Sequence, residues 1–186
     1  MSEIAIPPES QRRLLQLSRR TLEDFVRGAG RRSEEISDPY LRADRYGAFV
    51  SLHAIDELRG CIGSCTPDRC LYETVIEMTE AAASRDHRME PVRAAELAAI
   101  KIDISILSPL ERSENPLALQ VGRHGLYVTS RGRRGVLLPQ VAAQHGWDMQ
   151  TFLEQVCRKA GLKKNAWEDR ATMISSFTAL VIEEGR

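Results

Sequence analysis

The sequence predicts an α+β fold with a mainly antiparallel sheet and flanking helices. Segments in which apolar and polar residues alternate follow one another closely, and the turns between them are too short for crossover helices. Segments with a helical repeat of apolar residues stand between groups of these strands. They do not alternate with single strands, as the helices of a doubly wound nucleotide-binding fold would.

The first half of the chain predicts two helices around a hairpin. In residues 7–31 apolar side chains recur at helical spacing, with Ser10 as a candidate cap and Gly28 at the end. Residues 46–63 read as two strands joined near residues 54–57. A second helix is expected from Pro67 onward, so that its start lies close to Cys61.

The second half predicts more strands and one further helix. Residues 100–107 alternate isoleucine with polar residues, which is typical of a half-buried strand. Three short strands are expected at "LALQV", "GLYVTS" and "GVLLP", with hairpin turns at "GRH" and "RGRR". Asp148 is expected to cap a helix that Gly161 closes, and residues 172–184 to form one last strand.

The composition excludes several classes of protein. The 186 residues contain 26 Lys and Arg against 26 Asp and Glu, so no net charge favours nucleic acid or an anionic membrane. No apolar run reaches the roughly 18 residues of a membrane span, and the N-terminus lacks the features of a secretion signal. We therefore expect a cytoplasmic protein whose four cysteines are reduced.

The stretch "LRGCIGSC", residues 58–65, is the strongest candidate for chemistry. A thiol reacts as the thiolate, which a cation or a helix N-terminus stabilises, and Arg59 and the following helix are both close in sequence to Cys61. The amides of Gly60 and Gly63 could hold an oxyanion. The alternative is that Cys61 is a small buried residue beside a bulge. This stretch alone favours the alternative, because it specifies no base.

Other sites have weaker support. Cys61, Cys65 and Cys70 do not have the spacing of zinc or iron–sulfur ligands, so we expect no metal, and no nucleotide or other cofactor fingerprint is present. Of the four histidines we retain His124, because the glycines of "GRHG" suggest a bend that presents it. The "RGRRG" turn is either an anion clamp or a solvated hairpin tip, and the second is the commoner case.

Six segments, in order, resemble the AMMECR domain family, whose microbial members are called AmmeMemoRadiSam system protein A. They are "ELRGCIGS", "RDHRMEPVRAAEL", "IDISILSPLE", "GRHGLYV", "RRGVLLPQVAAQHGWDMQTFLEQVCRKAGL" and "AWED". The resemblance covers residues 46–186, and residues 1–45 form an N-terminal helix and loop of the same single domain. Members commonly have proline and phenylalanine in place of His87 and Met89, so a shared role for His87 is not expected.

The resemblance implies two lobes, the larger containing both chain ends, with a cleft between them that receives the signature. It also implies two partners, a Memo-type protein and a radical S-adenosylmethionine enzyme. The positions carried over are the signature residues Arg59, Gly60, Cys61, Ile62 and Gly63, and, in the other segments, His124, Arg134, Gly135, Pro139, Gln140 and Cys157.

Two classes of function follow. In the first, the cleft is enzymatic or binds a small ligand, with Cys61 as nucleophile or anchor and His124 as a possible base. The ligand-binding residues would be Arg59, Gly60, Ile62, Gly63, Arg134 and Gln140. In the second, the domain is a non-catalytic adaptor for the two partners. A third, minor option is a purely structural signature, for which substitution of Cys61 changes stability alone.

Overall fold

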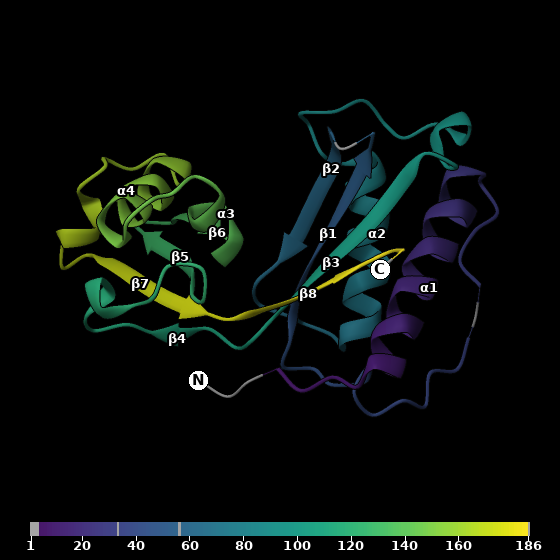
Figure 1. Ribbon diagram of the computed structural model, residues 1–186, viewed down its shortest axis with the longest axis horizontal. Coiled ribbons are helices and arrows are strands. Elements are labelled where there is room, and N and C mark those ends of the chain that lie inside the picture. Colours follow the sequence, from purple (N-terminus) through teal and green to yellow (C-terminus); the bar gives the residue numbers. More distant parts are fainter. Residues whose placement is uncertain (1–3, 33, 56, 186) are drawn as a thin grey trace. The chain divides into compact units, whose positions relative to one another are not determined.

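The computed structural model describes residues 4–32, 34–55 and 57–185, which form two compact units (Figure 1). The larger unit contains residues 4–107 and 180–185, and the smaller contains residues 108–179. Both combine helices with an antiparallel sheet, which confirms the α+β class. Over the described residues, no helix combines the length and the apolar composition that crossing a membrane requires.

The larger unit is built on a four-stranded sheet in the order β2-β1-β3-β8. The strands are β1 (Gly47–Ala54), β2 (Glu57–Ser64), β3 (Ile100–Leu107) and β8 (Ala179–Glu183). The expected hairpin is confirmed, because β1 pairs antiparallel with β2, and β3 pairs antiparallel with the other side of β1. Strand β2, which carries the signature, is therefore an edge strand of this sheet.

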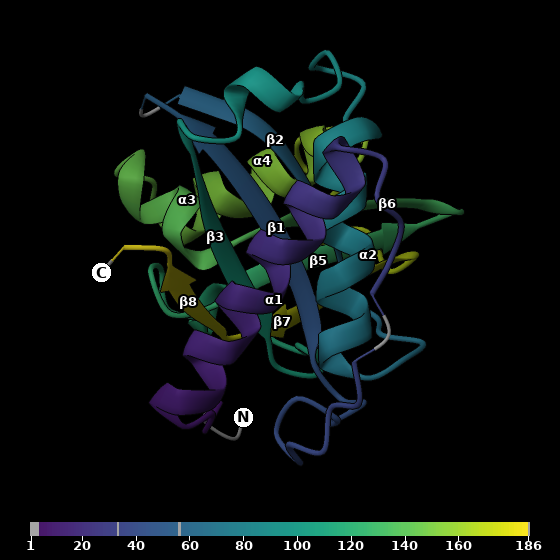
Figure 2. The same cartoon turned by 90° about the vertical axis from the view of Figure 1, so that its right-hand side faces the viewer.

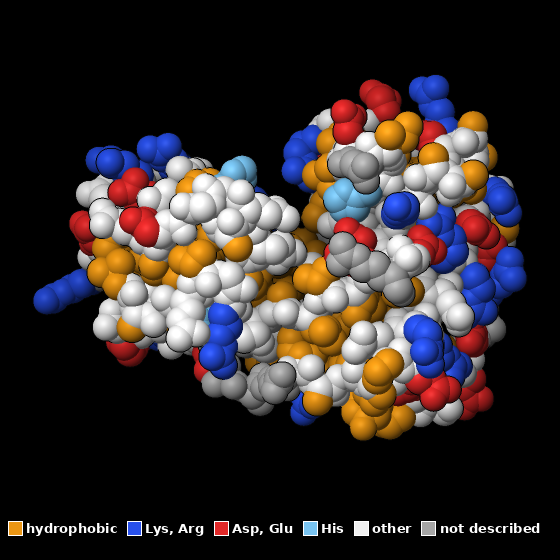
Figure 3. Space-filling view, in the orientation of Figure 1, with side chains coloured by type: hydrophobic (Ala, Val, Ile, Leu, Met, Phe, Trp, Pro, Cys, Tyr) orange, Lys and Arg blue, Asp and Glu red, His pale blue; other side chains and the backbone are white. Residues whose placement is uncertain are grey.

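Two long helices, α1 (Pro8–Val26) and α2 (Leu71–Ser84), cover one face of this sheet (Figure 2). Alternate residues of β1 and β3, such as Val50, Leu52 and Ile104, are fully buried against them. The other residues of β1 and β3 therefore project from the opposite face, as the two-residue period of a strand requires. On the face drawn in Figure 3, acidic and basic side chains intermingle over the larger unit.

The helix boundaries differ in part from those expected. Helix α1 begins at Pro8. Proline has no backbone N–H, so no donor is left without a partner at this first helical position. Ser10 is buried inside the helix and does not cap it. Helix α2 begins at Leu71, four residues after Pro67, because Cys70 is still extended, with φ −69° and ψ 162°. The end of α1 before Gly28, whose φ is +70°, is as expected.

Arg19 ties α1 to the end of the sheet. Its Nε donates to Oε1 of Glu184 at 2.8 Å and its Nη2 to Oε2 of the same carboxylate. The remaining donors reach the carbonyl oxygens of Leu97, at 3.2 Å, and Ile100, at 2.6 Å. One guanidinium therefore joins the N-terminal helix, the start of β3 and the residues after β8.

Replacing Arg19 with methionine is expected to lower the free energy of unfolding by about 2 kcal/mol, because charged hydrogen bonds in a partly buried setting are lost while the apolar stem is kept. Thermal denaturation followed by circular dichroism would show a melting temperature lower by roughly 4–8 °C. The exposed Arg12→Met, on the same helix, is the control. An equal shift in both variants would contradict this role for Arg19.

The smaller unit has its own four-stranded sheet, in the order β4-β7-β5-β6. The strands are β4 (Glu111–Arg112), β5 (Gly125–Ser130), β6 (Arg133–Leu137) and β7 (Thr172–Phe177), and the helices are α3 (Pro139–Gln144) and α4 (Met149–Lys159). The turn between β5 and β6 is the hairpin expected at "RGRR", with φ +50° at Arg131 and +80° at Gly132. Asp148 caps α4 as expected, accepting from the Thr151 amide at 2.7 Å.

Two expected strands were wrong. Residues 117–121 do not form a strand, since the short 3₁₀ helix η2 (Pro116–Ala118) and a turn occupy this region, and "GRH" lies in that turn and not in a hairpin. Residues 172–184 form two strands, β7 and β8, in different sheets, with Thr178 between them. Two further 3₁₀ turns, η1 (Ala94–Glu96) and η3 (Ala166–Glu168), complete the elements.

Candidate functional site

Cys61 lies near the middle of edge strand β2 and is half-buried. Its neighbours Gly60 and Ile62 face the helices: Ile62 packs against the buried core of the larger unit, and a Cβ on Gly60 would lie 2.2 Å from the Ala82 carbonyl oxygen of α2. Because side chains alternate along a strand, the Cys61 thiol is on the opposite face, away from α1 and α2. Glycine at position 60 thus lets α2 pack directly against the backbone of the signature.

A line of polar side chains crosses three strands on this face. Ser51 of β1 is opposite Cys61 and donates a hydrogen bond from Oγ to Sγ at 3.2 Å. On the other side of β1, Ser51 is opposite Asp103 of β3. Asp103 Oδ2 lies 3.1 Å from Nε2 of His53, two residues along β1. We refer to Cys61, Ser51, Asp103 and His53 as the polar row.

The backbone amide of Cys61 points out from the sheet edge, where it donates to Oδ2 of Asp86 at 2.9 Å. Antiparallel ladders alternate, so the amides of Gly60 and Ile62 face β1, and the amide of Gly63 is on the same outer side as that of Cys61. The sequence suggested that the amides of Gly60 and Gly63 hold an oxyanion. Of these two amides, that of Gly63 points away from the sheet at its outer edge, and that of Gly60 faces β1. The Cys61 amide is occupied by Asp86.

Asp86 is a buried carboxylate just after α2, with 4% of its side chain exposed. It accepts from the Arg88 guanidinium at 2.9 Å (Nε) and 2.7 Å (Nη2), and from the Arg88 amide at 3.2 Å. Arg88, together with the Cys61 and Arg88 amides, holds the pKa of Asp86 well below its usual range. The ion pair therefore anchors the edge of β2 without placing an unbalanced charge beside the thiol.

Arg59 is engaged in the structure of its own unit. Its Nε and Nη2 contact the Glu96 carboxylate at 2.6 Å and 3.2 Å, and the guanidinium also donates to the carbonyl oxygens of Glu90, at 2.6 Å, and Pro91, at 3.1 Å. The register of β1 and β2 shifts beside it, between Leu52 and His53. Arg59 thus fixes residues 90–96 to β2, and most of its donors are already used.

The start of α2 is not directed at Cys61. Its first amides, of Leu71 and Tyr72, donate to the carbonyl oxygens of Ala43, at 2.8 Å, and Leu41, at 3.0 Å. The signature instead packs near the C-terminal end of α2, where Ala82 meets Gly60. Since a helix C-terminus carries a partial negative charge, α2 does not stabilise a Cys61 thiolate as the sequence suggested.

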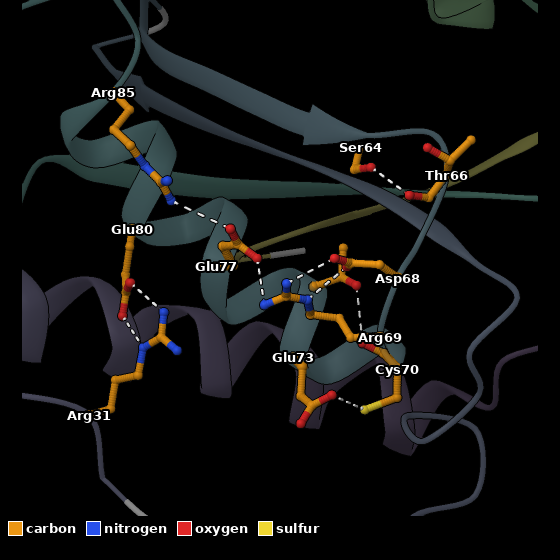
Figure 4. A network of polar contacts seen from close by, with 11 residues as sticks. Arg31, Ser64, Thr66, Asp68, Arg69, Cys70, Glu73, Glu77, Glu80 and Arg85 are labelled. Carbon is orange, nitrogen blue, oxygen red and sulfur yellow. Dashed lines mark hydrogen bonds and ion pairs between the residues drawn. The ribbon is translucent and has the colours of Figure 1, made fainter.

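The other three cysteines have separate environments, and none of the four, all of which are described, forms a disulfide. Cys70 precedes α2 and donates from Sγ to Glu73 Oε2 at 2.9 Å (Figure 4). Burial and the Glu73 carboxylate raise the pKa of Cys70, and burial raises that of Cys157. Cys65 is buried as well. Among the described residues, no three His, Cys, Asp or Glu side chains are grouped so that they could hold a metal ion.

The remaining predicted site residues, His124, Arg134 and Gln140, belong to the smaller unit. His124 is buried, and its Nδ1 accepts a hydrogen bond from the Gln120 amide at 2.8 Å, which closes the turn before β5. Burial lowers its pKa. Arg134 is exposed on β6, and Gln140 is half-buried in α3. The structure thus places the five signature residues on one strand of the larger unit: Arg59, Gly60, Cys61, Ile62 and Gly63. His124, Arg134 and Gln140 belong to the smaller unit.

Four residues at the site had no role in the sequence analysis: Ser51, His53, Asp86 and Asp103. A signal was present for three of them, because "FVSLHA" and "KIDIS" each place polar side chains at alternate positions of a strand. Their meeting point depends on the register in which β1 and β3 pair, which no local pattern specifies. Asp86 gave no signal, since a single aspartate after a helix is common on protein surfaces.

Comparison with known proteins shows the family to which the chain is similar. The AMMECR1 family model matches residues 15–182, which includes most of α1. The chain is 39% identical over 182 residues to a protein of Thermococcus gammatolerans, covering 92% of this chain and 88% of that one, and 38% identical over 180 residues to a protein of Methanopyrus kandleri, covering 92% and 86%.

A solved structure has the same fold. The crystal structure of uncharacterized protein PH0010 from Pyrococcus horikoshii superposes with a TM-score of 0.90 at 34% sequence identity, covering 97% of this chain and 94% of that one. The family match extends over most of the chain, and the relatives are similar over nearly their whole lengths. The chain therefore belongs to the AMMECR1 family.

Proposed function

We propose that the polar row is a small-ligand site in which the Cys61 thiol anchors or attacks the bound molecule. The observation that carries this proposal is the hydrogen bond from Ser51 Oγ to Cys61 Sγ on the face of the sheet opposite α1 and α2. The Ser51 hydroxyl thereby fixes the position of the sulfur within the polar row. The half-buried thiol, with His53 and Asp103 about one-third exposed at 33% and 30%, is also within reach of solvent.

The setting supports a site of fixed geometry. Its side chains come from three paired strands, and strands hold functional groups more precisely than loops do. Asp86 and Arg59 secure the two flanks of the signature by contacts to residues 86–96. These contacts use groups that a ligand would otherwise bind, so the ligand interacts with the thiol, with Ser51 and with the outward amide of Gly63.

Selective capture of small molecules tests this function. Purified protein is incubated with a metabolite extract and the retained molecules are identified by mass spectrometry, in the wild type, in Cys61→Ala and in Cys70→Ala. We expect retained molecules that Cys61→Ala loses and Cys70→Ala keeps, since Cys70 is engaged with Glu73 at a different place. Equal retention in all three proteins would contradict the proposal.

A second candidate is the adaptor function, with a Memo-type protein and a radical S-adenosylmethionine enzyme as partners. It is favoured by two exposed apolar side chains at the tip of the β1–β2 hairpin, Ile55 at 88% and Leu58 at 36% exposure. If this tip binds those partners, Ile55→Ser with Leu58→Ser abolishes co-purification, and Cys61→Ala does not. Partner binding that is unchanged by the double substitution would argue against the tip.

A further inference from the structure

We propose that His53, oriented by Asp103, is the base that accepts the proton of the Cys61 thiol. This inference rests on the proposed function of the polar row and assigns a role within it. The sequence suggested His124 as a base; its Nδ1 accepts from the Gln120 amide, whereas His53 lies in the same sheet as Cys61. The Ser51–Cys61 and His53–Asp103 contacts, together with the strand register, support this role.

The register brings His53 and Cys61 to the same face. Cys61 is paired with Ser51, and His53 is two residues from Ser51 on the same strand. The register shifts at His53, which pairs with Leu58, but the alternation along β1 is kept, so His53 and Cys61 share a face and lie diagonally across β1 and β2. Such neighbours have Cα atoms about 7–8 Å apart, within the reach of long or aromatic side chains. In this proposal a single bridging water carries the proton across the gap between ring and sulfur, because the Ser51 hydroxyl already donates its own proton to Sγ.

Asp103 fixes which ring nitrogen is available. Its Oδ2 is 3.1 Å from Nε2 of His53, so in the neutral ring Nε2 carries the hydrogen and Nδ1 keeps its lone pair. A nucleophile, a histidine and a carboxylate that orients the histidine is the arrangement that activates cysteine and serine in unrelated folds. Here each of the three groups is supplied by a different strand, β2, β1 and β3.

The proton balance is simple. The S–H proton passes from Cys61 to Nδ1 of His53, which leaves a thiolate and an imidazolium, and Ser51 Oγ then donates to the thiolate in the direction already observed. With an alkylating reagent such as iodoacetamide, the S–C bond forms, the C–I bond breaks and iodide leaves. The imidazolium afterwards returns its proton to water.

The surrounding charges permit this transfer. The Asp103 carboxylate stabilises the imidazolium, and Lys101, opposite His53 on β3, is exposed, so that solvent screens its opposing effect. Near Cys61, Asp86 is neutralised by Arg88, and Arg59 by Glu96. Among these groups, His53 is therefore the one that gains a charge when it accepts the thiol proton, and Asp103 is its partner.

The pH dependence of alkylation tests the assignment. The rate of iodoacetamide labelling of Cys61 is measured by peptide mass spectrometry between pH 5 and pH 10, in the wild type, His53→Gln, Asp103→Asn and the control His145→Gln, an exposed histidine of the smaller unit. We expect His53→Gln to label about tenfold more slowly at pH 7 and at the wild-type rate near pH 10, where the thiol ionises without a base. For Asp103→Asn we expect a smaller fall in the labelling rate at pH 7, by about threefold.

The outcomes separate this inference from the proposed function. A wild-type rate profile in His53→Gln overturns the role of His53, whatever molecules the protein retains. If retention depends on Cys61 and the His53→Gln profile is unchanged, the ligand site stands and the base does not. A purely structural role for His53 would slow or speed labelling equally at all pH values, which would also overturn the assignment. A wild-type Cys61 that labels no faster at pH 7 than a model thiol would overturn both.

Discussion

Replacing Asp86 with alanine is expected to lower the free energy of unfolding by about 2–3 kcal/mol, because it removes a buried carboxylate that accepts from the Cys61 amide and from Arg88, whose side chain is itself 60% exposed. Chemical denaturation, followed by circular dichroism, measures this loss. Asp68→Ala is the matched control, since the Asp68 side chain is 77% exposed in its ion pair with Arg69 (Figure 4). The control is expected to change stability far less, because solvent screens an exposed ion pair.

The pH dependence gives an independent check on Asp86. Its pKa in the folded protein is held below that of the unfolded chain, so its contribution to stability is complete above the unfolded value, near pH 4, and is lost as the pH falls toward the folded value. Asp86→Asn should therefore be less stable than the wild type at pH 7, and the gap should narrow below pH 4. A constant gap from pH 7 to pH 3 would show that the carboxylate charge contributes nothing.

The second large effect is expected at Gly60. A methyl group at this position would lie 2.2 Å from the Ala82 carbonyl oxygen, and the obstacle is helix backbone, which cannot move aside as a flexible side chain can. Gly60→Ala must therefore push α2 away from β2, at a cost of about 2–3 kcal/mol. The melting temperature should fall by roughly 5–10 °C.

Leu58→Ala is the control for Gly60→Ala, because it changes an exposed residue of the same strand. Amide hydrogen exchange locates the effect: protection in β2 and the last turns of α2 should fall in Gly60→Ala, and that of β5 and β7 in the smaller unit should not. Unchanged protection at β2 would mean that α2 accommodates the methyl group, contrary to the packing described.

Much of the fold could be predicted because its signals are local. Apolar residues at helical spacing mark α1, alternation marks β1 and β3, and Asp148 marks the start of α4. The errors have physical causes as well. The run from residue 172 to residue 184 alternates without a break, but at Thr178 the chain leaves one sheet and enters another. No glycine or proline marks this point in the sequence. At residues 117–121, Pro116 initiates a 3₁₀ turn where apolar composition suggested a strand.

The site was harder to predict than the fold. Cys61 and its glycines stand out in the sequence, yet the helix expected to activate the thiol meets the signature near its opposite end, because the direction of α2 relative to β2 is a property of the packing. Arg59 looked available to a ligand, but it is bound by Glu96, 37 positions away. His53 and Asp103 became candidates only when the pairing of β1 with β3 was known.

The chain path through the two sheets has a consequence for protein synthesis. Strand β8 takes the place beside β3, so the larger unit lacks one strand until the ribosome has made all of the smaller unit, which lies between them in the sequence. Until then β3 presents unpaired peptide groups along one side, and Arg19 has no carboxylate from Glu184. The edge of β3 therefore stays unpaired in the nascent chain while more than 70 residues, from residue 108 to residue 179, are synthesised.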